Sequence, residues 1–207
     1  MTVLCYGDSN THAYDPHTGG RYPKDLRWTT ILGRLLGEDY EIIPEGLNGR
    51  TTAYDRIGEA WKNGFPYLRP CIESHKNVDC IVFMLGTNDC NVEMELSAED
   101  IAAGMEKLVR TAKEVCMEEQ SYVPKIILTV PAAISPDFAG TPFEYQLGQS
   151  SVDKSRAIAP LYEAIAKRHG CRFVDASGLE VSPLDCEHLT PESHRELAGR
   201  IAAEILK

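Results

Sequence analysis

The sequence lacks clustered lysines and arginines and long apolar runs, and each absence argues against a class of protein. The 207 residues carry 21 Lys and Arg against 31 Asp and Glu, which gives a formal net charge of −10. Nucleic acids and anionic membranes are bound through concentrated positive charge, so this balance argues against both partners. No apolar run approaches the length of a transmembrane helix. Strand-like sequence begins at Thr2 without a basic segment before it, so we expect no signal peptide.

The sequence also lacks the patterns of paired cysteines and of metal ligands. The seven cysteines are odd in number, scattered, and without a C-x-x-C pair. They are typical of reduced thiols in a cytoplasmic protein, several of them packed as small apolar residues, and they argue against zinc. Neither D-x-D nor H-x-x-E-H occurs, and the G-x-S-x-G of α/β-hydrolases is absent too.

What is present is an alternation of apolar runs and helical patterns. Strands are expected at residues 3–6, 40–43, 81–85, 126–130 and 172–174. Helices are expected at 28–36, after Ser97, from about Val152, and after Thr190-Pro191. The alternation predicts an α/β fold with a mostly parallel sheet of about five strands, in a single domain spanning 1–207.

The connecting segments are expected to be less regular. Residues 10–27 and 132–150 are interpreted as long loops, and a loop as long as the second is often functional. The stretch that ends near Lys76 is expected to be only partly helical, because Gly64, Pro66 and Pro70 interrupt it. His194 is expected on the surface of the last helix.

Polar residues gather where successive strands end. Ser9 follows the first strand, Asn48-Gly49 the second and Asn88-Asp89 the third, and Asp185-x-x-His188 precedes the last helix. In a parallel sheet these loops meet at the carboxyl edge, where open α/β folds bind their ligands. Each signal alone has a plainer interpretation as a turn or a helix cap. For the plainer interpretation to be right, all four loops that share this edge would have to be simple turns or helix caps.

The residue types at this edge suit acyl transfer. A serine hydroxyl needs a base to take its proton, and His188 can serve Ser9 in this way. Asp185 can accept from the far nitrogen of the imidazole and so fix its tautomer. The N–H groups of Ser9 and Gly49 and the side-chain amide of Asn88 are suitable donors for an oxyanion.

At this point the residues resemble a known family. Gly7-Asp8-Ser9, Gly49, Gly86-x-Asn88-Asp89 and Asp185-x-x-His188 are similar, in order and spacing, to the four blocks of the SGNH hydrolases, which are the GDSL-type esterases and lipases. The segment 46–52 further resembles the small arylesterase and acyltransferase branch. The resemblance implies a flavodoxin-like three-layer α/β/α fold. It implies Ser9, Asp185 and His188 as catalytic residues and Ser9, Gly49 and Asn88 as the oxyanion hole. It implies no metal or organic cofactor.

The resulting expectation is a serine esterase that hydrolyses short acyl esters, such as acetyl, aryl or carbohydrate acetyl esters, through an acyl-enzyme. Acyl transfer to another alcohol stays open, and the resembling branch suggests a homo-oligomer. Two alternatives come from other classes. One is a metal-dependent phosphoester hydrolase that uses Asp8, Asp89, Asp185 and His188. The other is a non-catalytic carbohydrate-binding module on the same scaffold.

One position departs from the family's pattern. The family often has Gly and an apolar residue between the last Asp and His, whereas this chain has Cys186 and Glu187. A carboxylate beside His188 would either raise the pKa of the imidazole or face solvent.

Overall fold

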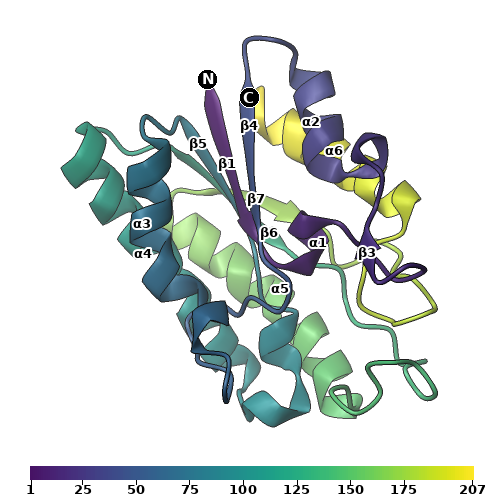
Figure 1. Ribbon diagram of the computed structural model, residues 1–207. Coiled ribbons are helices and arrows are strands. Elements are labelled where there is room, and N and C mark those ends of the chain that lie inside the picture. Colours follow the sequence, from purple (N-terminus) through teal and green to yellow (C-terminus); the bar gives the residue numbers. More distant parts are fainter.

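The computed structural model describes residues 1–207, and its centre is a sheet of five parallel strands in the order β4-β1-β5-β6-β7. The strands are β1 (Thr2–Gly7), β4 (Glu41–Gly46), β5 (Cys80–Met84), β6 (Lys125–Val130) and β7 (Arg172–Asp175). The helices are α1 (Ser9–His12), α2 (Trp28–Leu36), α3 (Gly64–His75), α4 (Ala98–Gln120), α5 (Gln149–His169) and α6 (Pro191–Ile205). Helices α2 and α6 cover one face of the sheet, and α3, α4 and α5 cover the other (Figure 1). The predicted three-layer α/β/α architecture is confirmed.

Alternate residues of each strand supply the two halves of the core. Leu4 and Tyr6 of β1 lie in the half that α3, α4 and α5 cover. Val3 and Cys5 lie in the half that α2 and α6 cover. Because successive side chains of a strand point to opposite faces, a strand covered on both faces has to be apolar throughout. The central strand β5 is therefore apolar along its whole length, and every residue in it is buried.

The edge strand β4 differs from β5 in burial and in composition. None of its residues is fully buried, and it contains Pro44, which pairs with Cys5 of β1. Proline has no N–H to donate to the ladder, so it is tolerated at an edge, where one side of the strand is unpaired.

The predicted helix ends are confirmed at three places. Ser97 Oγ accepts from the N–H of Asp100, and the Asp100 carboxylate accepts from the N–H of Ser97, so a complete capping box opens α4. Thr190 caps α6 just before a proline at its first position. Gly170 adopts the left-handed conformation after α5, where a residue with a side chain would be strained.

Two segments are more regular than the sequence indicated. Helix α3 is continuous from Gly64 to His75 despite its two prolines. Pro66 lies in the first turn, where backbone N–H groups have no helical partner in any case, so it costs little there. Burial of Leu68 and Ile72 against the core outweighs the lost bond at Pro70. The expected loop 10–27 holds α1, a small hairpin of β2 (Tyr14–Asp15) with β3 (Gly20–Arg21), and a 3₁₀ turn at Lys24–Leu26.

The expectation for His194 was wrong. Its side chain is almost completely buried, and its Nδ1 accepts a hydrogen bond of 3.4 Å from the N–H of Trp28. Burial lowers the pKa of His194 to about 3, so the ring is neutral at physiological pH. Its exposed neighbours in sequence made the position resemble a surface one, although α6 packs this face against the start of α2.

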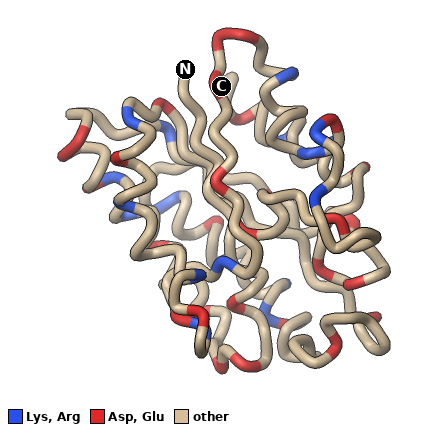
Figure 2. Tube along the Cα trace, in the orientation of Figure 1, with Lys and Arg blue, Asp and Glu red and all other residues tan.

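The cysteines and the charged residues are arranged as the composition indicates. All seven cysteines are unpaired, and six of them are buried. Lys and Arg are distributed along the chain among the acidic residues (Figure 2). None of the helices combines the length and the hydropathy that crossing a bilayer requires.

A buried hydrogen bond ties the first strand to the start of α3. The hydroxyl of Tyr6 donates to the carbonyl oxygen of Gly64 at 2.6 Å. We expect Tyr6→Phe to lower the free energy of unfolding by about 1 kcal/mol, because it removes this bond and keeps the ring. Urea unfolding measures the change, with Tyr40→Phe, at a half-buried tyrosine without such a bond, as the matched control. Equal effects of the two substitutions would contradict the prediction.

Candidate active site

The turn after β1 places Ser9 at the carboxyl edge of the sheet. A Cβ on Gly7 would lie 2.1 Å from Thr11 Oγ1 and 2.8 Å from the carbonyl oxygen of Met84, so this turn requires glycine. Asp8 then caps α1 by accepting from the N–H of Asn10 at 2.9 Å. Ser9 is the first residue of that single-turn helix.

Ser9, His188 and Asp185 form a chain of hydrogen bonds. Asp185 Oδ2 lies 2.7 Å from His188 Nδ1, and His188 Nε2 lies 2.8 Å from Ser9 Oγ. An ionised carboxylate can only accept, so Nδ1 carries the ring proton and Nε2 accepts from the serine hydroxyl. Asp185 Oδ1 also accepts from the backbone N–H of His188 at 3.2 Å, which fixes the carboxylate relative to the ring. The structure thus brings together three of the predicted site residues, which are up to 179 residues apart in the sequence.

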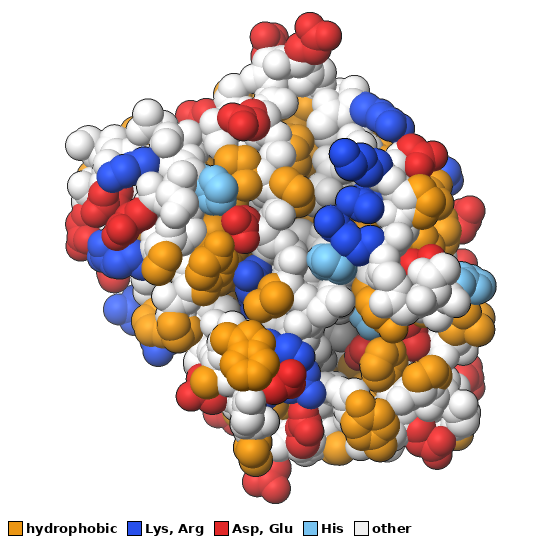
Figure 3. Space-filling model, viewed as in Figure 1, with side chains coloured by type: hydrophobic (Ala, Val, Ile, Leu, Met, Phe, Trp, Pro, Cys, Tyr) orange, Lys and Arg blue, Asp and Glu red, His pale blue; other side chains and the backbone are white.

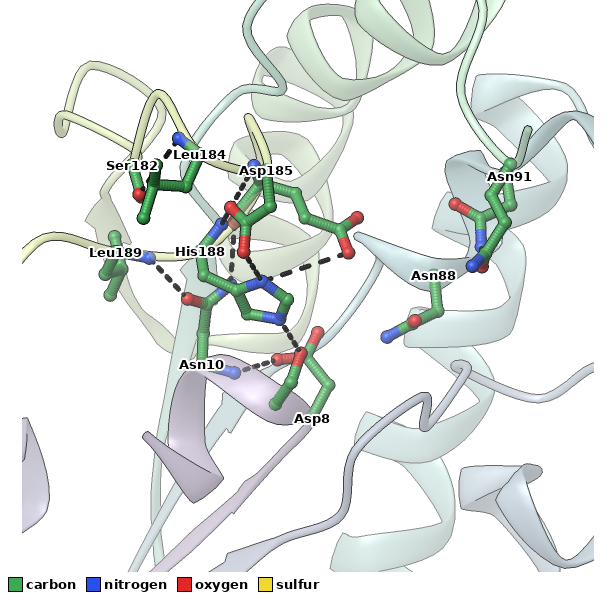
Figure 4. Close-up of polar contacts among 12 residues, drawn as sticks. Asp8, Asn10, Asn88, Asn91, Ser182, Leu184, Asp185, His188 and Leu189 are labelled. Carbon is green, nitrogen blue, oxygen red and sulfur yellow. Dashed lines mark hydrogen bonds and ion pairs between the residues drawn. The ribbon is translucent and has the colours of Figure 1, made fainter. Parts of the chain in front are cut away.

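Asn10 holds this chain together and was missed in the sequence. Its Nδ2 donates to the carbonyl oxygen of Glu187 at 3.2 Å, and its Oδ1 accepts from the N–H of Leu189 at 2.9 Å. These two bonds flank His188 and attach its loop to α1, as Figure 4 shows for the bond to Leu189. The signal that was available is an amide placed directly after the candidate nucleophile.

Gly49 and Asn88 lie on the same pocket as Ser9 and His188. Gly49 has a φ of 80°, and a Cβ there would lie 2.8 Å from Lys62 Nζ, so a side chain would be both strained and crowded. The amide nitrogen of Asn88 donates to the carbonyl oxygen of Arg50 at 3.1 Å, which leaves its second N–H available. Asn88 faces His188 from across the open part of the site (Figure 4).

Arg50 also stabilises this arrangement, and its role was not predicted from the sequence. Its side chain is nearly completely buried, and its Nη1 donates to the carbonyl oxygens of Gly7 and Glu45. The guanidinium lies 4.3 Å from the centre of the Tyr6 ring, within the range of a cation–π contact. It therefore joins the ends of β1 and β4 to the loop whose carbonyl holds Asn88.

The pocket has a volume of about 350 Å³ and a strongly polar lining. Its walls are formed by Ser9, Tyr14, Asn48, Gly49, Arg56, Glu59, Lys62, Asn88, Phe143, Tyr145, Gln146, Glu187 and His188. Three of these residues come from the loop 132–150, which was expected to be functional. The surface is hollowed below the centre of the space-filling view, where hydrophobic, basic, acidic and histidine side chains lie close together (Figure 3).

Several pKa values around Ser9 are shifted by burial and by neighbouring carboxylates. Burial disfavours the imidazolium of His188, but the hydrogen bond to Asp185 and the nearby charge of Glu187 outweigh it and raise the pKa of His188. Burial raises the pKa of Asp8 to about 7, and its Oδ2 has no hydrogen-bond partner. Burial also raises the pKa of Glu187. Of the two sequence alternatives for Glu187, the raised pKa of His188 agrees with these shifts, and exposure to solvent does not, because Glu187 is buried.

The acidic residues near Ser9 do not form a set of metal ligands. Both carboxylate oxygens of Asp89 accept from the N–H of Thr52, and one of them also accepts from its hydroxyl. The one group of three ligand atoms within 4.8 Å of each other is Glu45, Cys71 and His75, which lies outside this pocket. The donor geometry therefore does not favour the metal-dependent alternative.

Asp8 should make the stability of the fold depend on pH. The folded protein keeps a proton on Asp8 up to about pH 7, whereas an unfolded chain releases it near the ordinary value of 3.8. In that window the folded state binds more protons, so stability falls as pH rises towards 7. Asp8→Asn cannot ionise, so its stability relative to wild type should increase between pH 4 and 7 and level off above.

The expected gain is on the order of a few kcal/mol, because each unit of pKa difference corresponds to about 1.4 kcal/mol. Thermal melts of both proteins at pH 4.5 and 7.5 measure it, given as the difference between Asp8→Asn and wild type. Asp39→Asn, at an exposed position, is the control and should show the same difference at both pH values. A difference for Asp8→Asn that does not change with pH would contradict the shift.

Comparisons with known proteins show the family of the chain. Residues 5–196 match the GDSL-like lipase/acylhydrolase family. A search of curated proteins found no match. The solved structure of Est24, a carbohydrate acetylesterase from Sinorhizobium meliloti, is 33% identical, with a TM-score of 0.91 over 99% of this chain and 98% of that one. The native aryl esterase of M. smegmatis is 31% identical, with a TM-score of 0.91 over the same shares.

A more distant structure extends the likeness of the fold alone. The lipase/acylhydrolase of Enterococcus faecalis is 17% identical, with a TM-score of 0.68 over 99% of this chain and 94% of that one. The family match covers most of the sequence, and the two esterases align with nearly the whole chain at more than 30% identity. This protein therefore belongs to the GDSL-like lipase/acylhydrolase family, also called SGNH hydrolases, and is a carboxylic ester hydrolase that acts on small-molecule esters.

Proposed function

We propose that this protein is a serine esterase of short-chain acyl esters, with Ser9 as nucleophile, His188 as general base and Asp185 as its partner. The observation that carries the proposal is the continuous chain of hydrogen bonds from Asp185 through His188 to Ser9, which ends at a pocket shared with Gly49 and Asn88. A serine is activated as a nucleophile when its hydroxyl donates to a base that a third group orients.

In the acylation step, Ser9 Oγ attacks the ester carbonyl carbon while its proton passes to His188 Nε2. The carbonyl oxygen becomes an oxyanion, for which the N–H groups of Ser9 and Gly49 and the amide of Asn88 are the proposed donors. Asp185 stabilises the imidazolium that forms. The tetrahedral intermediate then collapses, the bond to the alcohol oxygen breaks, and His188 returns the proton to that oxygen. The alcohol leaves, and an acyl-Ser9 ester remains.

In the deacylation step, a water molecule takes the place of the alcohol. His188 removes its proton, the oxygen attacks the acyl carbon, and the proton returns to Ser9 Oγ as the acid is released. An alcohol in the place of water would give a new ester, which is acyl transfer by the same chemistry. The ratio of ester to acid formed in aqueous alcohol measures how the acyl-enzyme divides between the two.

The lining of the pocket supports short acyl groups and polar alcohols. A cavity of about 350 Å³ lies at the small end of the range for ligand sites. Arg56, Glu59 and Lys62 bring charges of both signs into it, which disfavours a long apolar tail. Tyr14 and Phe143 pack around His188, with ring centres 4.5 and 5.9 Å from the imidazole, and offer an apolar surface to an aryl or acetyl group. Acetyl esters of aryl alcohols or carbohydrates fit this combination, as the names of the similar structures also suggest.

A fluorophosphonate tests the proposal without a guess at the substrate. The reagent modifies an activated serine, so we expect stoichiometric labelling that peptide mass spectrometry places on Ser9. His188→Ala should slow labelling by at least about 10³-fold, because the base is lost. Ser177→Ala, at a serine outside the pocket, is the control and should label like wild type. No labelling of the folded wild type would remove Ser9 as the nucleophile.

The pH profile gives an independent check of His188. The imidazole must be neutral to act as a base, and its pKa is raised above the ordinary value of 6.5. We therefore expect kcat/KM to fall with decreasing pH around a midpoint above 6.5. Hydrolysis of 4-nitrophenyl acetate followed from pH 5 to 9 measures this midpoint. A midpoint at or below 6 would mean that the carboxylates near His188 do not outweigh its burial.

A further inference from the structure

Glu187 presents a carboxylate to the catalytic pocket, and no protein group donates to it. The residue is 8% exposed and lines the pocket together with Ser9, Asn88 and His188. Its backbone is fixed, since its N–H donates to Asp185 and its carbonyl oxygen accepts from Asn10. Its Oε1 lies 4.0 Å from His188 Nδ1, beyond hydrogen-bond distance. That nitrogen is already paired with Asp185 at 2.7 Å.

A carboxylate in this position is costly, because burial removes much of its hydration and no protein donor replaces it. Burial raises the pKa of Glu187 because the charged form loses hydration. A donor supplied by the substrate would recover part of that cost, since a hydrogen bond to a charged acceptor is among the stronger ones in proteins. The other acidic residue of the pocket, Glu59, differs in this respect, because its carboxylate is held by Lys62 at 2.6 Å.

The charges around the pocket select the kind of donor. Two cations stand near Gly49, where a Cβ would meet Lys62 Nζ at 2.8 Å and Arg56 Nη1 at 3.1 Å. Both cations are already paired with carboxylates, Lys62 with Glu59 and Arg56 with Glu93, each at 2.6 Å. An anionic ligand would be repelled by Glu187, whereas a neutral ligand with hydroxyl groups can donate to that carboxylate.

The place of Glu187 also selects which part of the ester carries the hydroxyl. In the proposed mechanism His188 returns its proton to the leaving alcohol, so the alcohol must lie beside the imidazole. Glu187 is the residue directly before His188, and it lines the pocket onto which Ser9 and His188 open, with its Oε1 4.0 Å from His188 Nδ1. We propose that Glu187 is a specificity-determining residue that accepts a hydrogen bond from a free hydroxyl on the alcohol portion of the substrate, so that partly acylated polyols and sugars are preferred over simple alkyl esters. This inference rests on the proposed esterase function.

A matched pair of esters tests it. Glycerol 1-acetate and propyl acetate share the acetyl group and a three-carbon primary alcohol, and they differ in two hydroxyls. The measured quantity is the ratio of kcat/KM for glycerol 1-acetate to that for propyl acetate, followed by acid release in a pH-stat at pH 8. Any effect of a substitution on the basicity of His188 or on the reactivity of Ser9 acts on both esters and cancels in the ratio.

We expect Glu187→Leu to lower this ratio by about tenfold or more, as the loss of one hydrogen bond to a charged group predicts. Glu187→Gln keeps an acceptor oxygen of similar shape, so its ratio should lie between those of wild type and Glu187→Leu. Glu180→Leu makes the same change at an exposed glutamate of the same loop, and it should leave the ratio unchanged. Near-ultraviolet circular dichroism shows whether Glu187→Leu folds. If it does not, the inference is tested by Glu187→Gln alone, whose ratio should be lower than that of wild type.

A second pair of esters tests the placement. Methyl lactate and methyl propanoate share the alcohol and differ by a hydroxyl on the acyl group, so their ratio should not respond to Glu187. An unchanged glycerol-to-propyl ratio in the variants would overturn the inference, and so would a response confined to the lactate pair. Failure of the esterase function itself is distinguishable, because wild type would then hydrolyse neither acetate and would not be labelled by a fluorophosphonate.

Discussion

Two hydrogen bonds from the amide of Asn10 hold the site in register. The chain reaches His188 through a largely buried loop after β7, which backbone hydrogen bonds also hold, such as that from the N–H of Ser182 to the carbonyl oxygen of His188 at 2.7 Å. Asn10 binds the residues on both sides of His188, accepting from Leu189 and donating to Glu187. Because Asn10 directly follows Ser9, the same contact that positions the loop sets the distance of 2.8 Å between the serine oxygen and the imidazole. Rigid placement of this kind is what allows a hydroxyl to be activated before a substrate arrives.

The other wall of the site depends on a different buried group. The guanidinium of Arg50 is nearly excluded from water, so its donors need partners inside the protein. Its Nη1 donates to carbonyl oxygens at the ends of β1 and β4, and the Tyr6 ring lies against the guanidinium. The carbonyl oxygen of Arg50 in turn accepts from the amide of Asn88. The two walls are therefore anchored separately, one through the first helix and the other through the edge strand, and both meet at the end of β1.

Much of this was predictable from the sequence, because it depends on local chemistry or on a period. The continuous apolar run of β5 indicates a strand covered on both faces, and the capping box of Ser97 with Asp100 marks the start of α4. The four polar loops were predicted to share an edge because parallel strands bring their ends together. The structure places Ser9, Gly49, Asn88 and His188 on one pocket, as that rule requires.

The failures of prediction share a physical cause, because each depends on contacts between distant segments. Helix α3 persists through Pro70 since the core buries Leu68 and Ile72, which local helix propensity does not register. His194 is buried because α6 packs against α2, and Asn10 and Arg50 acquire their roles only through partners that are remote in sequence. A hydrogen-bond partner 177 residues away leaves no local pattern.

The carboxylates around His188 have two opposing effects. They stabilise the positive charge of the imidazolium, and they raise the pKa of the imidazole. Asp185 and Glu187, and Asp8 when it is ionised, favour the imidazolium, which in the proposed mechanism forms while Ser9 attacks. The same field raises the pKa of His188, so a larger fraction of the base is already protonated near neutral pH and cannot accept from Ser9. Burial of the ring acts in the opposite direction and limits the rise. An apolar residue in place of Glu187 would remove one of the fields that favour the imidazolium. This chain instead keeps a carboxylate there, accepts the higher pKa of its base, and leaves that carboxylate facing the pocket without a protein partner.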